Sequence, residues 1–168
     1  KKELQKKYPS IKFKTSTDTE VVLEGFSREG KTFLSKLNGM FALAIFDKKE
    51  NNLFIIRDPL GIKPLFYTFQ RGGVFFCSEI KGLLKIKSLN RTINFQSLAD
   101  QLSYMYVPEP NTLYNEFFKV VPGYLITFNS GREISREYLY SEINEKIVFT
   151  SNEEAIYTFK TTWANSVK

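Results

Sequence analysis

Residues 37–67 read LNGMFALAIFDKKENNLFIIRDPLGIKPLFY, and this stretch decides the fold. A charged turn at residues 48–52 separates two apolar segments, which predicts a hairpin of two β-strands. Both alternating faces of residues 41–46 are apolar, so we expect a strand buried on both sides and central in a layered structure. Pro59, Gly61 and Pro64 then fix a loop that a simple hairpin does not need.

The rest of the chain predicts further helices and hairpins. A polar cluster at residues 15–18 offers N-caps for a helix that Gly30 ends, and a shorter helix follows around residues 33–37. Residues 1–8 have the spacing of a helix end, and residues 11–13 read as extended. Two more hairpins are predicted at 65–69 with 74–77 and at 124–128 with 133–139, and two more helices at 79–84 and 95–106.

Composition excludes several classes of protein. With 168 residues, 42% of them hydrophobic, the chain has room for one globular domain, or one domain and part of the next. One cysteine and no histidine exclude an internal disulfide, a Ser-His or Cys-His nucleophile pair and a His-ligated metal. No apolar run reaches the roughly 20 residues that a membrane helix needs, and no leader is visible, which favours a cytoplasmic protein. The net charge of +6 is dispersed, which disfavours nucleic-acid binding.

Few residues suggest chemistry by themselves. Asp18 at a helix start reads as an N-cap or first-turn acid. Arg57 and Asp58 read as a structural salt bridge, and Cys77, in an apolar strand without a base, reads as an inert thiol. Residues 61–63 lack the further glycines and the Ser or Thr of a phosphate-binding loop.

The last segment has two interpretations. Ser151 and Glu154 form a capping-box pattern, and an apolar stripe on an amphipathic helix follows at Ile156, Phe159, Trp163 and Val167. This helix either packs on the preceding domain or opens a second domain, and we favour the second interpretation.

Six segments in order resemble the glutamine amidotransferase type 2 domain of glutamine-hydrolysing asparagine synthetases. Residues 17–21 resemble the Ser-Asp-Thr-Glu motif of that family, and residues 37–42 and 57–65 are the most specific matches. The other segments are 78–84, 106–108 with 112–114, and 121–125. The last three favour asparagine synthetase over the related amidophosphoribosyltransferases.

The resemblance implies an α+β fold of the N-terminal-nucleophile type, an αββα sandwich of two antiparallel sheets between helical layers. It implies that an N-terminal cysteine attacks the side-chain amide of glutamine, and that the released ammonia is used in a synthetase domain to convert aspartate to asparagine with ATP and Mg²⁺. It also implies that Asp18 binds the α-amino group of glutamine.

The same resemblance implies that parts of the enzyme lie outside the chain. We expect residues 1–143 to be the amidotransferase domain without its N-terminal part, and residues 144–168 to be a linker and the first synthetase helix. The nucleophile would precede Lys1, so no catalytic residue and no metal ligand is assigned here, and no cofactor is expected on this segment. The segment alone is expected to be inactive and, with unpaired sheet edges, to fold poorly.

Other interpretations stay open. The chain could come from a β-lactam-synthetase-like relative or from an amidotransferase that modifies another carboxylate. It could also be a non-catalytic module that binds glutamine or a partner chain. The sequence allows a homodimer and does not decide the oligomeric state.

Overall fold

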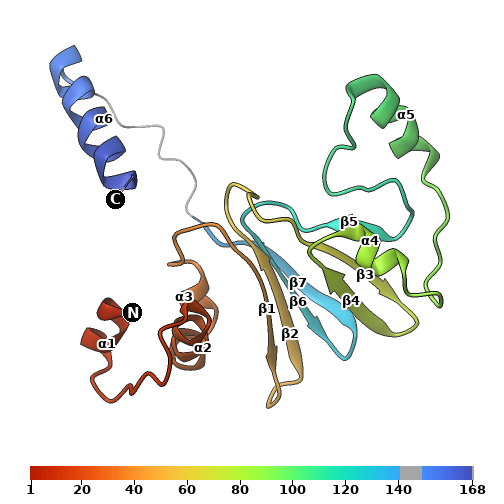
Figure 1. Cartoon of the computed structure of the whole chain (residues 1–168), viewed down its shortest axis with the longest axis horizontal. Helices are drawn as coiled ribbons and strands as arrows, with labels where there is room; N and C mark the ends of the chain where they lie inside the picture. Colours follow the sequence, from red (N-terminus) through yellow and green to blue (C-terminus); the bar gives the residue numbers. More distant parts are fainter. Residues whose placement is uncertain (141–148, 168) are drawn as a thin grey trace.

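The computed structural model describes residues 1–140 and 149–167, which form two β-sheets with helices outside them (Figure 1). The helices are α1 (Lys2–Lys7), α2 (Asp18–Glu29), α3 (Lys31–Leu34), α4 (Ile80–Leu84), α5 (Phe95–Tyr104) and α6 (Asn152–Ser166). The strands are β1 (Ala42–Asp47), β2 (Asn52–Arg57), β3 (Phe66–Gln70), β4 (Gly73–Cys77), β5 (Phe117–Lys119), β6 (Tyr124–Asn129) and β7 (Arg132–Tyr138). None of the described helices is long and apolar enough to cross a membrane.

Both sheets are antiparallel. The first sheet has the order β1-β2-β6-β7 and the second sheet has the order β4-β3-β5. Ile55 and Phe128 of the first sheet pack against Tyr67 of the second. On its other face, the first sheet contacts the helices α2 and α3 through Phe54, and α4 covers the outer face of the second sheet. The layers are therefore helix, sheet, sheet and helix, as predicted.

The strand β1 does not have the central place that was expected for it. Among the described strands it pairs only with β2, at the edge of the first sheet, and the strands buried on both faces are β2 and β6. Leu43 and Ile45 pack toward the helices, but Ala44 and Phe46 on the opposite face are exposed, Phe46 by 55%. The prediction was wrong because the described strands of the second sheet leave this part of β1 uncovered.

Two features of the local structure go beyond the predictions. Residues 11–13, which were predicted to be extended, lie outside the helices and strands, and Ile11 is buried against α1 and α3. The strand β5 was not predicted, because three residues are too few to show an alternating pattern. Its position is set by pairing with β3, in which Thr68 lies opposite Phe117.

Arg57 and Asp58 are buried and structural, as expected, but they form no salt bridge with each other. The Arg57 guanidinium donates to the carbonyls of Gly61, Lys63 and Val120 at 2.6 to 2.9 Å and pairs with Glu109 at 2.9 Å. The Arg57 charge is therefore satisfied by the loop at residues 61–63 and by the distant residues Glu109 and Val120. Because Val120 lies between β5 and β6, these bonds hold the loop against the β5–β6 connection.

The carboxylate of Asp58, which is 1% exposed, accepts the N–H groups of Leu60, Ile62 and Lys63 at 3.0 to 3.2 Å. Burial alone would raise the pKa of Asp58, but these N–H groups hold it below its ordinary value of 3.8. Gly61 completes the turn with a φ of +64°, and a Cβ there would lie 2.7 Å from Pro122.

The helix α6 begins as predicted, with the Ser151 hydroxyl accepting the N–H of Glu154 at 3.1 Å. It has no buried residue, and Trp163 and Phe159 are each 64% exposed. Figure 1 shows α6 apart from the sheets. The expected boundary between residues 143 and 144 lies outside the described residues, so the assignment of α6 to a second domain stays a prediction.

We expect Asp58→Asn to lower the free energy of unfolding by about 3 kcal/mol, because the buried N–H groups lose a charged acceptor. The stabilisation by Asp58 is fully present above the unfolded-state pKa and is lost as the pH falls through the lowered folded-state pKa. Denaturant titrations of the wild-type chain and of Asp58→Asn should therefore be done at pH 7 and below pH 4. The difference between their free energies of unfolding should be smaller at the lower pH. The matched control is Asp47→Asn, in which the lost carboxylate accepts N–H groups of an exposed turn. An equal loss of unfolding free energy in both variants would contradict the stabilising role of Asp58.

Trp163, the only tryptophan of the chain, reports on α6. Because its side chain is 64% exposed, we expect a red-shifted fluorescence emission that acrylamide quenches almost as well as that of free tryptophan. A blue-shifted, protected emission in the 168-residue chain would show that α6 packs on the two sheets.

Candidate functional site

The segment Thr17-Asp18-Thr19-Glu20 forms the N-terminus of α2, and three of its members have distinct tasks. Thr17 is the N-cap, and its hydroxyl accepts the N–H of Glu20 at 3.4 Å. The Glu20 carboxylate accepts the N–H groups of Lys14 and Thr15, each at 2.7 Å, and so holds the loop before the helix. These donors, with the Thr15 hydroxyl, hold the pKa of Glu20 below its ordinary value of 4.5.

Asp18 is the first residue of α2 and is exposed. Its Oδ1 accepts the N–H of Thr19 at 2.9 Å, which is its only hydrogen bond among the described residues. A carboxylate at this place is stabilised by the helix dipole, and its second oxygen is free to accept a hydrogen bond from a ligand. Of the two carboxylates in the segment, Asp18 is therefore the one available to a cation.

A pocket of about 250 Å³ brings Asp18 next to the segment on which the sequence argument began. Asp18, Thr19 and Val22 of α2 form one wall, and residues 37–41 with Leu43 form the other. Gly39 makes the connection possible with a φ of +143°, a backbone conformation that side chains disfavour. Two of the segments that resemble family motifs, residues 17–21 and 37–42, therefore line the same pocket.

Cys77 lies far from this arrangement in the fold. It is half-buried in β4 and packs against α4, where the space next to its sulfur would not admit a side chain at Gly82. The residues that the structure describes also contain no group of three metal-ligating side chains. Neither observation gives this chain a nucleophile or a metal centre.

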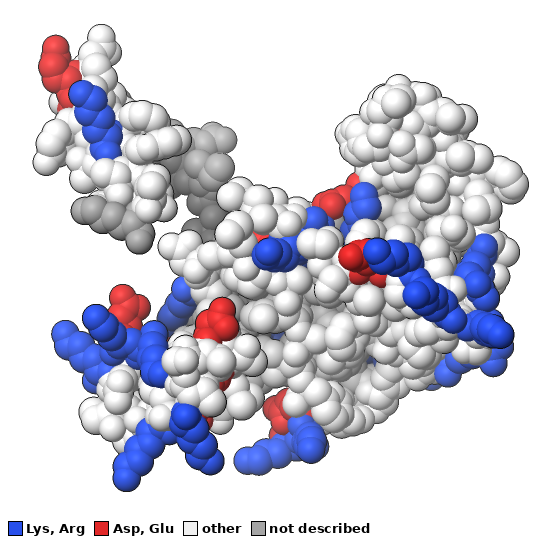
Figure 2. Space-filling model, in the orientation of Figure 1, with Lys and Arg blue, Asp and Glu red and all other residues white. Residues whose placement is uncertain are grey.

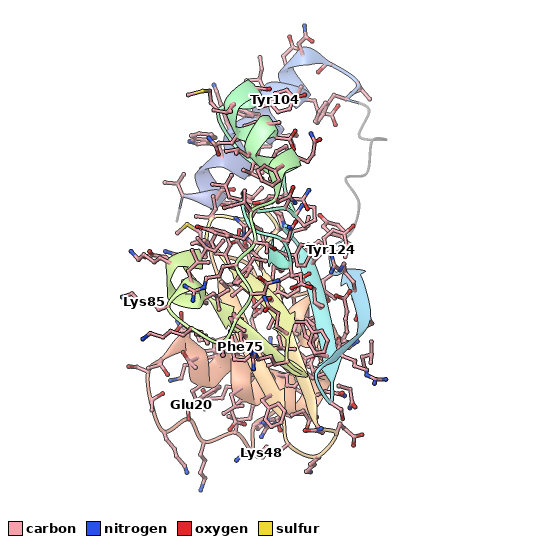
Figure 3. The ribbon with its side chains drawn as sticks, turned by 90° about the vertical axis from the view of Figure 1, so that its right-hand side faces the viewer. Glu20, Lys48, Phe75, Lys85, Tyr104 and Tyr124 are labelled. Carbon is pink, nitrogen blue, oxygen red and sulfur yellow. The ribbon has the colours of Figure 1, made fainter. Side chains whose placement is uncertain are left out.

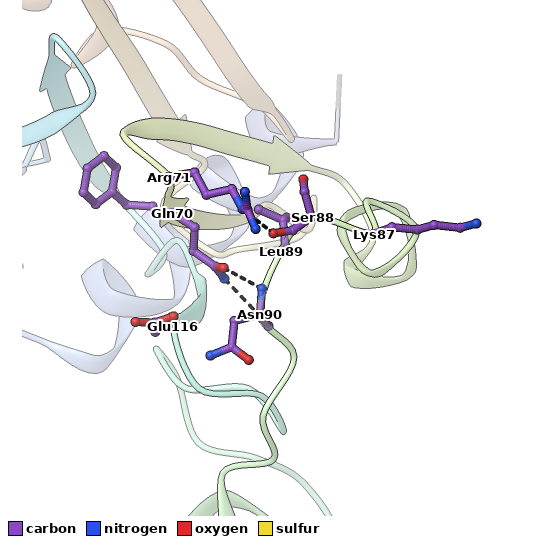
Figure 4. Close-up of a pocket in the computed structure, with 8 residues that line it drawn as sticks. Gln70, Arg71, Lys87, Ser88, Leu89, Asn90 and Glu116 are labelled. Carbon is purple, nitrogen blue, oxygen red and sulfur yellow. Dashed lines mark hydrogen bonds between the residues drawn. The ribbon is translucent and has the colours of Figure 1, made fainter.

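A larger hollow of about 670 Å³ lies between the β3–β4 turn and residues 87–90 (Figure 4). Its buried polar side chain, Gln70, accepts the N–H of Asn90 at 2.7 Å and donates to the carbonyl of the same residue at 3.2 Å. Arg71 donates to the carbonyl of Ser88 at 2.5 Å. These side chains hold the loop in place, so the pocket at Asp18 remains the candidate site.

The charged side chains do not point to a different site. On the face drawn in Figure 2, Lys and Arg side chains are scattered over several parts of the molecule rather than gathered in one patch. Several lysines have nearby acids: Lys7 and Lys36 both contact Glu29, whose pKa they lower to about 2.

The model of the glutamine amidotransferase domain family matches residues 1–139. The chain belongs to this family. It is 37% identical over 144 residues to asparagine synthetase 1 (glutamine-hydrolysing) of Bacillus subtilis, a match that covers 86% of this chain and 22% of the relative. It is 40% identical over 100 residues to asparagine synthetase 2 of the same organism, with coverages of 59% and 13%.

The fold is confirmed by a solved structure. Glutamine phosphoribosylpyrophosphate amidotransferase from Bacillus subtilis, in complex with ADP and GMP, matches 85% of this chain and 27% of its own, with a TM-score of 0.56 and 21% identity. The predicted α+β sandwich of the N-terminal-nucleophile type is therefore correct. The chain spans about a quarter or less of the length of these relatives.

Sequence reasoning found Asp18 but not its surroundings. Asn38 and Met40 belong to the family motif at residues 37–42, and they line the same pocket as Asp18. The Gly39 between them was the available signal, because a glycine between a helix and a strand often marks an unusual backbone conformation. The binding role of Asp18 is not decided by this geometry and stays a prediction.

Proposed function

We propose that this chain is part of a glutamine-dependent asparagine synthetase and supplies part of its glutamine site. The observation that carries the proposal is the pocket in which Asp18, with one free carboxylate oxygen, faces the segment 37–41. Membership of the glutamine amidotransferase family and the names of the two similar proteins from Bacillus subtilis support it.

In this proposal, Asp18 binds the α-ammonium group of glutamine. A charge-assisted hydrogen bond between a carboxylate and an ammonium group is stronger than one between neutral groups. The exposed Asn38 and the backbone at Gly39 line the same pocket, where they are available to the rest of the amino acid. Ammonia released from the glutamine side chain would then amidate aspartate.

The remaining chemistry is assigned to parts of the enzyme outside this chain. ATP with Mg²⁺ would activate the aspartate carboxylate in a synthetase domain. The described residues have neither an acidic cluster for the metal nor a phosphate-binding loop, so they do not fit these groups and no step on this chain involves them. The nucleophile is likewise assigned elsewhere, since Cys77 packs in a hydrophobic cluster and the chain has no histidine.

In the protein that carries this segment, we expect Asp18→Asn to reduce kcat/KM for glutamine about 10- to 100-fold, which corresponds to a charged hydrogen bond of about 1.5–3 kcal/mol. The measurement is asparagine formation from aspartate and ATP with glutamine, repeated with ammonium chloride as the nitrogen source. The ammonia-dependent rate should not change, because Asp18 contacts only glutamine.

Asp47→Asn is the matched control, since it removes a carboxylate at the far end of β1, outside the pocket at Asp18. An unchanged glutamine-dependent rate in Asp18→Asn would overturn the assigned role. Activity with another carboxylate in place of aspartate would show that the enzyme is an amidotransferase with a different acceptor.

The 168-residue chain alone should release no ammonia from glutamine. A coupled glutamate dehydrogenase assay measures this, with Cys77→Ser as the companion variant. Ammonia release that Cys77→Ser abolishes would make Cys77 the nucleophile and would contradict the proposal.

A further inference from the structure

The Glu20 side chain has more hydrogen bonds than a helix cap requires. Its carboxylate accepts three bonds of 2.7 Å, from the N–H groups of Lys14 and Thr15 and from the Thr15 hydroxyl. In an ordinary capping box, a glutamate at this position returns only to the N–H of the N-cap residue. Here the N–H of the N-cap, Thr17, is bonded to the Thr15 hydroxyl oxygen instead, at 3.3 Å.

These bonds form a closed ring around the start of α2. The Thr15 hydroxyl has one proton, which it gives to Glu20, so the Thr17 hydroxyl must be the donor in the 2.8 Å contact between the two threonines. The Thr17 oxygen in turn accepts the N–H of Glu20. The ring thus fixes the loop of residues 14–17 and the first turn of the helix as one unit.

Asp18 lies inside this unit, between Thr17 and Glu20, although its own side chain takes no part in the ring. Asp18 lines the pocket, and the residue before it, Thr17, has an extended backbone with φ −75° and ψ 146° that the ring holds. Figure 3 shows Glu20 near the lower end of the molecule, away from Tyr104 of α5 at the upper end.

We propose that Glu20 is a positioning residue of the glutamine site, which acts by holding Asp18 in the direction that receives the α-ammonium group. This inference rests on the proposed function. Three donors occupy the oxygens of the Glu20 carboxylate, so Glu20 does not compete with Asp18 for the ligand, and the two neighbouring carboxylates have separate roles. The lowered pKa of Glu20 agrees with this arrangement, because the donors favour its ionised form.

The test is a double-mutant cycle in the protein that carries this segment. We expect Glu20→Ala to raise the KM for glutamine about tenfold, since a small misplacement of a binding group is costly. The ammonia-dependent rate should stay unchanged. In the background of Asp18→Asn, the same substitution should change that KM by less than about twofold, because a residue that acts through Asp18 has no effect once Asp18 is lost.

Glu24→Gln is the control, since Glu24 lies one turn further along α2 and forms an ion pair with Arg28. If Glu20→Ala does not fold, Thr15→Val removes, at constant size, the hydroxyl that donates to Glu20 and accepts from Thr17. The two backbone N–H groups still hold the Glu20 carboxylate in this variant, so the same KM should rise less strongly. Effects that add in the double variant, or that lower the ammonia-dependent rate equally, would overturn the inference while leaving the role of Asp18 intact. A failure of Asp18→Asn alone would instead overturn the proposed function.

Discussion

The burial of Arg57 and Asp58 is the constraint on which the structure depends. Two adjacent charges at 8% and 1% exposure must find partners, because an unpaired buried charge costs several kcal/mol. They find them in the loop that follows and in distant segments, at Glu109 and at Val120. The backbone of the pair also accepts the N–H of Gly123, at 3.2 and 3.0 Å, so one pair of residues joins the end of β2 to the start of β6.

Arg57 and Asp58 also hold one wall of the candidate site. The N–H of Asp58 donates to the carbonyl of Phe41 at 2.9 Å, and Arg57 pairs with Ala42 across β1 and β2. Phe41 is the last residue of the loop that lines the pocket at Asp18. The glutamine site that we propose therefore has two supports, the Arg57-Asp58 loop behind one wall and the Glu20 ring behind the other.

Exposed apolar surface sets the context for the proposed function. Phe46 on β1, Phe95 and Leu102 on α5 and Trp163 on α6 are each more than half exposed. These side chains contribute little to the core of the described residues, and the similar proteins are several times longer than this chain. The proposal that a synthetase domain works with this fold offers an explanation for these exposed apolar side chains. The stability of the described residues does not explain them.

The sequence by itself determined the alternation of the strands, the loop at Pro59 to Pro64, the capped start of α2 and the family, because these depend on local patterns and ordered motifs. Only the tertiary structure decided which strands are central, since the apolar pattern of β1 does not reveal whether a second sheet covers it. It also decided that Arg57 pairs with Glu109, 52 residues away, and that Asn38 lies beside Asp18. Such pairings depend on how distant segments pack, which no local pattern of residues contains.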